Sequence, residues 1–114
     1  MKIIYNNIIP FKGFKAMNIF GVLFVRKGMN MTDTDIRHES IHTAQQREML
    51  FVFFYLWYVI EWVIRLCLYR HAHKAYRNIS FEREAYDMQR DLLYLDDRKH
   101  YAWVKYLKHY EATK

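Results

Sequence analysis

The distribution of helix-breaking residues constrains the fold of this chain more than any other feature. All its prolines and glycines lie in the first 28 of its 114 residues: Pro10, Gly13, Gly21 and Gly28. Residues 29–114 contain neither type. Because proline and glycine form turns and interrupt helices, residues 1–28 are predicted to form strands and turns, and residues 29–114 are predicted to be helical.

The first part holds two segments rich in β-branched and aromatic residues, "KIIY" and "NIFGVLFV". Such segments favour short strands, and Asn6–Asn7 and Lys12–Gly13 mark turns between them. A length of 114 residues suits one domain with one modest core. We therefore expect a single α+β domain over residues 1–114, with a small N-terminal sheet of two or three strands followed by a mainly helical part.

Four helices are expected in the second part. The first begins near Thr32 or Thr34, either of which can cap it. The second covers residues 49–69, and residues 70–78 are predicted to be a connection. The third begins at Ser80, which can cap it, and runs through "FEREAYDMQRDLLYLDD" to residue 97. The last is expected over residues 100–112.

Residues 49–69 are unusually apolar, because 19 of these 21 residues are apolar or aromatic. A helix without a polar face must be covered all round, and about 20 residues suffice to cross a bilayer. Against a span, Glu61 and Arg65 suit a helical ion pair, and charges inside a membrane are costly. We favour a buried helix, completed by a second copy if the core is too small, over docking on a membrane surface, and we rank a span last. Cys67 is expected to lie in the core.

Charge and processing signals bear on partners and location. The formal net charge is +6, and residues 1–32 carry five cationic residues and no acid. Such an end can meet nucleic acid or anionic lipid, but no base-reading motif accompanies it, so no nucleic-acid partner is expected. The N-terminus has no signal-peptide pattern, and one cysteine cannot form an internal disulfide. We expect a location in the cytoplasm or at the inner face of the membrane.

The segment "HESIH", residues 38–42, carries the clearest chemical signal. His38 and His42 lie about 40° apart on one helix face, so both imidazoles can reach one metal ion. Glu39 points away from that axis but can reach a water molecule held on the metal, which is the arrangement of the zinc-peptidase motif H-E-x-x-H. The alternative is an ordinary helix with two surface histidines and an exposed glutamate.

Zinc in such a site requires a third protein ligand, and no further histidine follows at a short spacing. The segment "SFEREAYDMQ" offers Glu82 and Glu84. On a helical wheel Glu82 lies within the apolar arc, whereas Glu84 lies on the polar side with Asp87 and Asp91. Glu82 is thus expected to face the core, where a carboxylate is costly without a cation. The alternative is that both acids only suit the positive end of the helix.

The pair of motifs, "HESIH" and, some forty residues later, "EREA", resembles the gluzincins, metallopeptidases with two zinc histidines and a glutamate on a second helix. The chain is most similar to their minimal single-domain forms, the minigluzincins, and to small metallopeptidase-like proteins of Bacteroidetes bacteria that carry "HExIHTAQ" and "FEREAY". The specific motifs cover roughly residues 36–48 and 79–88.

The resemblance implies a Zn²⁺ site with His38, His42 and Glu82 as ligands and Glu39 as general base and acid. It implies hydrolysis of peptide bonds in a peptide or protein substrate. The competing interpretations are a non-catalytic helical scaffold or a membrane-associated interaction protein, with zinc structural or absent.

The resemblance also bears on other positions. The family has Asp or Asn four residues after the ligand glutamate, where it orients a zinc histidine; here that residue is Tyr86. Candidates for oxyanion stabilisation are Tyr86, Tyr76 and His73. In this family a strand before the active-site helix offers its edge to extended substrate, and "FGVLFVRKG" is the candidate. The histidines of "HAH", residues 71–73, are expected on a surface connection rather than at a second metal site.

Overall fold

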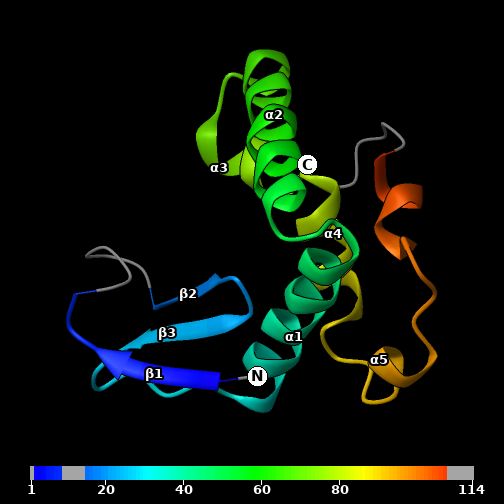
Figure 1. The fold of residues 1–114 in the computed structure, drawn as a ribbon. Helices are drawn as coiled ribbons and strands as arrows, with labels where there is room; N and C mark the ends of the chain where they lie inside the picture. Colours follow the sequence, from blue (N-terminus) through cyan, green and yellow to red (C-terminus); the bar gives the residue numbers. More distant parts are fainter. Residues whose placement is uncertain (1, 9–14, 108–114) are drawn as a thin grey trace.

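The computed structural model describes residues 2–8 and 15–107, and it has the predicted α+β architecture (Figure 1). The elements in chain order are β1 (Lys2–Asn6), β2 (Ala16–Ile19), β3 (Val22–Arg26), α1 (Asp33–Glu48), α2 (Val52–Tyr69), α3 (Ala72–Arg77), α4 (Ser80–Met88), α5 (Tyr94–Asp97) and the 3₁₀ helix η1 (Ala102–Leu107). Figure 1 shows the sheet beside α1 at one end of the molecule and the pair α2 and α3 at the other.

The sheet has the order β1-β3-β2, with β3 parallel to β1 and antiparallel to β2. The segment "NIFGVLFV" therefore forms a hairpin and not one strand. Its two turn residues, Phe20 and Gly21, have φ of 50° and 82°, as the tight turns that match strand twist require. The predicted turn at Lys12–Gly13 lies outside the described residues.

The central place of β3 overturns one prediction about substrate binding. Residues of "FGVLFVRKG" were expected to offer a free strand edge, but β3 pairs on both sides. Leu23 and Val25 are fully buried, while their neighbours on β3 are half-buried, as expected when alternate side chains face a core. The outer strand nearest the helices is β2, whose Asn18 donates hydrogen bonds to the Glu39 carbonyl and the Thr43 hydroxyl on α1.

Thr32, one of the two residues predicted as caps of the first helix, caps α1. Its hydroxyl accepts a hydrogen bond from the Asp35 N–H (3.0 Å), and the Asp35 carboxylate accepts one from the Thr32 N–H (3.1 Å). This reciprocal pair satisfies two backbone donors at the start of the helix. The helix ends at Glu48, and the chain turns through Leu50 and Phe51, both with positive φ, before α2 begins.

Helix α2 is not the buried central helix that we favoured from the sequence. Nine of its large apolar side chains are exposed: Val52, Phe53, Leu56, Trp57, Val59, Ile60, Val63, Ile64 and Leu68. Its neighbour α3 has only 6 residues, and the contacts of α2 with α3 and α1 leave much of its surface uncovered. Cys67 is also exposed, contrary to the expectation of a core position.

The predicted pair of Glu61 and Arg65 is present on the covered face of α2, with 3.0 Å between carboxylate and guanidinium. The Glu61 carboxylate also accepts hydrogen bonds from the backbone N–H (2.7 Å) and the hydroxyl (2.6 Å) of Ser80. Ser80 was predicted to cap α4 with its own side chain. This was wrong, because the carboxylate from α2 satisfies the free N–H at the start of α4 instead.

The remaining helix predictions need correction. Residues 70–78, predicted to be a connection, contain α3, and His71 caps it by accepting a hydrogen bond from the Lys74 N–H. The third helix ends at Met88 instead of continuing to residue 97, and Leu92 and Leu93 beyond it are exposed. Of the last predicted helix the structure shows only η1, and residues 108–112 lie outside the described part. After α4 ends at Met88, the following segment folds back against α1 and α4. There Arg98 forms ion pairs with Glu48 and Glu84.

The pairing of Glu61 with Arg65 predicts a large effect on stability. Because both side chains are buried, replacing Glu61 with Gln leaves an unpaired guanidinium and weakens the link to α4, and we expect the free energy of unfolding to fall by about 3 kcal/mol. Urea unfolding measures this loss. Thr32→Ala, which removes only a cap, should cost about 1 kcal/mol and serves as the reference. Equal losses in the two variants would contradict a stabilising role for the ion pair.

Candidate metal centre

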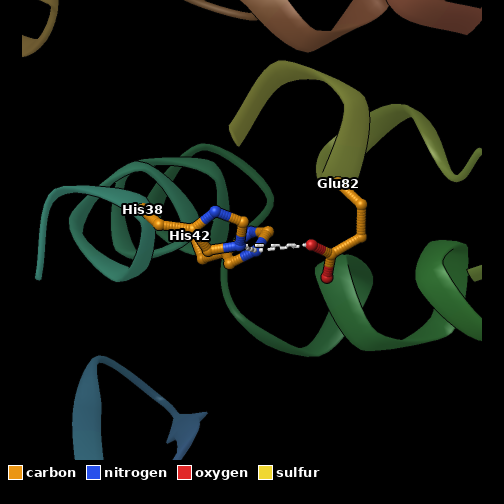
Figure 2. Close-up of side chains that lie close together, drawn as sticks. All are labelled: His38, His42 and Glu82. Carbon is orange, nitrogen blue, oxygen red and sulfur yellow. Dashed lines mark hydrogen bonds and ion pairs between the residues drawn. The ribbon is translucent and has the colours of Figure 1, made fainter. Parts of the chain in front are cut away.

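Helices α1 and α4 bring two histidines and one glutamate together (Figure 2). His42 Nε2 lies 3.1 Å from His38 Nε2 and 3.1 Å from Glu82 Oε1, and His38 Nε2 lies 3.3 Å from the same oxygen. All three side chains are buried. The three residues predicted as metal ligands therefore converge at one point, and among the described residues they are the one such cluster able to hold a metal ion.

The distances suit a metal ion with tetrahedral coordination. For bonds of about 2.0–2.1 Å, the ligand atoms of a tetrahedral zinc site lie about 3.3 Å apart. The observed separations of 3.1–3.3 Å are close to this value. The site therefore needs little rearrangement to accept an ion, although the same donor set also suits other divalent transition metals.

The other ring nitrogens of the two histidines are held by glutamine side chains. His38 Nδ1 lies 2.8 Å from Gln89 Oε1, and His42 Nδ1 lies 2.8 Å from Gln45 Oε1. Because an amide oxygen only accepts, each Nδ1 carries the hydrogen and each Nε2 can direct its lone pair to the centre of the cluster. Metal-binding histidines are commonly oriented in this way.

The cluster attracts positive charge. Burial lowers the pKa of His42, but the Glu82 carboxylate outweighs this effect and raises the pKa to about 9. Burial likewise raises the pKa of Glu82, but His42 and His38 outweigh it and hold that pKa well below its usual range. Two lone pairs and a carboxylate in a buried space require a cation, which is either a proton or a metal ion.

Glu82 is also held by a residue that sequence reasoning missed. The hydroxyl of Tyr58, on α2, donates a hydrogen bond of 2.6 Å to Glu82 Oε2. The bond fixes the second carboxylate oxygen and leaves Oε1 directed at the two imidazoles. Tyr58 lies in the apolar run 49–69, where nothing in the pattern distinguishes it from neighbouring aromatic residues.

The second acid of α4, Glu84, is fully buried, so its predicted position on a polar face was wrong. Gln45 Nε2 donates to Glu84 Oε1 (2.9 Å), and Arg98 and Tyr94 bind the same carboxylate. The wheel failed because the segment after α4 folds back over this side of the helix. A chain of hydrogen bonds therefore runs from His42 through Gln45 to Glu84 and Arg98.

A cavity of about 720 Å³ opens beside the cluster, within the size range of ligand sites. The three clustered side chains and Glu39 all line it. Burial raises the pKa of Glu39, although the two histidines oppose the shift. Glu39 thus lies on the same helix as the two histidines, as the motif predicts, and lines the same cavity as all three candidate ligands.

The three candidates for oxyanion stabilisation, Tyr86, Tyr76 and His73, also line the cavity. The Tyr86 hydroxyl lies 3.0 Å from the Tyr76 hydroxyl, and the Tyr86 ring packs edge-on against His38 with 4.6 Å between ring centres. Tyr86 contacts His38 through its ring, whereas the hydrogen bond that orients His38 is donated by its Nδ1 to the side-chain oxygen of Gln89, three residues after Tyr86.

The hydrogen bond from His42 to Gln45 predicts a specific loss of metal affinity. Gln45→Ala should weaken zinc binding about 10- to 100-fold, because the imidazole loses the group that fixes its orientation. Competition with a chromogenic chelator measures the affinity. Gln46→Ala is the matched control, since Gln46 is equally buried on the same helix and has no hydrogen bond to either histidine among those of the described residues. Equal affinities for the two variants would contradict the orienting role of Gln45.

Comparison with known proteins found no matching protein family, no similar curated protein and no similar solved structure. The interpretation of this centre therefore depends on its geometry and chemistry.

Proposed function

We propose that this chain is a zinc-dependent peptidase whose metal is held by His38, His42 and Glu82. The observation that carries the proposal is the convergence of these three side chains from two helices, at separations that suit tetrahedral zinc, on the wall of a cavity. The resemblance of the two motifs to the gluzincins supports the same interpretation. When bound, zinc lowers the pKa of a coordinated water toward neutrality and polarises the carbonyl of the scissile bond.

Glu39 acts as the general base and acid in this proposal. It takes a proton from the attacking water and passes it to the leaving amine. Its position one residue after His38, and its place on the cavity wall, support this role. Tyr86, Tyr76 and His73 lie on the same wall and are candidates to donate a hydrogen bond to the oxyanion.

The residues that line the cavity support an extended peptide as substrate. Ala16, Met17 and Asn18 of β2 line it, and among the described residues β2 is an outer strand of the sheet, so a peptide can add to its edge. Much of the remaining wall is aromatic, including Phe54 and Trp62. We therefore expect a preference for peptide segments with apolar side chains.

The decisive variant is Glu39→Gln, which keeps the shape of the side chain and removes its basicity. We expect hydrolysis of an unstructured protein to fall about 10²- to 10⁴-fold, the usual contribution of general acid–base catalysis, while the zinc content is unchanged. Rates are measured by release of labelled peptides, and zinc by mass spectrometry of the purified protein. Equal rates for native and variant protein, with zinc bound, would instead indicate a scaffold with a structural metal.

Removal of the metal gives an independent prediction. A chelator should abolish hydrolysis by the native chain, and added Zn²⁺ should restore it. Added Zn²⁺ should not restore hydrolysis by Glu82→Gln, because this variant lacks the only anionic ligand of the cluster. Zn²⁺ should also raise the melting temperature of the native chain, because it binds the folded state in preference to the unfolded one. If Glu82→Gln bound zinc as tightly as the native chain, Glu82 would not be a ligand.

A further inference from the structure

Helix α2 presents one continuous apolar face to solvent. At 100° per residue, its nine exposed large side chains and Cys67 cover about 180° of the helix circumference. With 18 residues, the face is about 27 Å long. Scattered apolar residues are normal on a protein surface, but a contiguous face of this size marks a site of interaction.

The charged residues of α2 are turned away from this face. Glu61 and Arg65 lie on the covered side, where they pair with each other and with Ser80. The four acids between residues 40 and 86 are shielded from solvent, each in a hydrogen bond: Glu48, Glu61, Glu82 and Glu84. Two arginines, Arg47 just before α2 and Arg70 just after it, are exposed. Residues 47–70 therefore show solvent an apolar surface, with an exposed cation at each end of the segment and no exposed acid.

We propose that the exposed face of α2 docks on a bilayer that contains anionic lipids, with the helix lying along the interface. The apolar side chains enter the boundary of the acyl chains, and Arg47 and Arg70 contact the anionic headgroups. The proposal does not depend on zinc or on hydrolysis.

Two alternative occupants fit the structure less well. By length and composition α2 is able to cross a membrane, and only 17% of it is buried. However, a helix in the bilayer core would lose the bonds that Tyr58 and Glu61 make with α4. A second copy of the chain would bring exposed arginines together, because both ends of the face carry the same sign. Anionic lipid matches both ends.

The test uses the full chain, synthesised in a cell-free system with lipid vesicles and then floated on a density gradient. We expect flotation with vesicles of phosphatidylcholine and phosphatidylglycerol, weaker flotation with phosphatidylcholine alone, and release of the protein by alkaline carbonate. Retention after carbonate treatment would indicate a span and overturn the proposal.

Paired variants locate the contact. Ile60→Glu with Ile64→Glu places two charges on the face and should reduce flotation at least tenfold. Leu92→Glu with Leu93→Glu adds the same charge at two exposed leucines and should leave flotation unchanged, because the segment between α4 and α5 lies away from α2 (Figure 1). Arg47→Gln and Arg70→Gln should each weaken binding to anionic vesicles about fivefold and have little effect with neutral ones.

Size-exclusion chromatography with light scattering tests the remaining alternative, a dimer in which a second copy covers α2. Absence of flotation, together with a dimer that the variant at Ile60 and Ile64 converts to a monomer, would show that a second copy covers α2. Equal flotation of the two double-glutamate variants would also overturn the proposal, because the face would then not be the contact.

Discussion

The buried carboxylate of Glu82 is the group on which the arrangement of the helices depends. It projects from α4, faces His38 and His42 of α1, and accepts a hydrogen bond from Tyr58 of α2. A carboxylate in such a place is unfavourable unless a cation and hydrogen-bond donors surround it. The convergence of three helices and the capacity to bind a metal are therefore linked, because the same contacts serve both.

Other buried carboxylates connect segments in the same way. Glu61 joins α2 to the start of α4, and Glu84 joins α4 to Gln45 of α1 and to Arg98 of the returning chain. These links supplement a small buried apolar cluster, which consists of Phe54, Ile79, Phe81 and Trp103. On α2 the charged side chains of Glu61 and Arg65 lie on the covered side, and the outer face is apolar. A bilayer surface is an environment that suits this distribution.

Some features of the site followed from spacing, and others did not. The shared face of His38 and His42 and the inward direction of Glu82 were predicted, because each depends on the geometry of a single helix. The burial of Glu84 and the roles of Tyr58 and Gln89 were not predicted. Each of these depends on a segment distant in sequence, and a helical wheel treats a helix as if it stood alone.

The sequence by itself determined the division into a sheet and a helical part, the start of the first helix near Thr32 or Thr34, and the pairing of Glu61 with Arg65. These depend on backbone preferences and on contacts within one or two turns of a helix, which residue spacing records. Only the tertiary structure decided that Glu82 meets the two histidines, that β3 lies in the middle of the sheet, and that the outer face of α2 stays exposed. These depend on which distant segments pack together, and the chain turns between them at residues such as Leu50 and Arg70, which are not helix breakers.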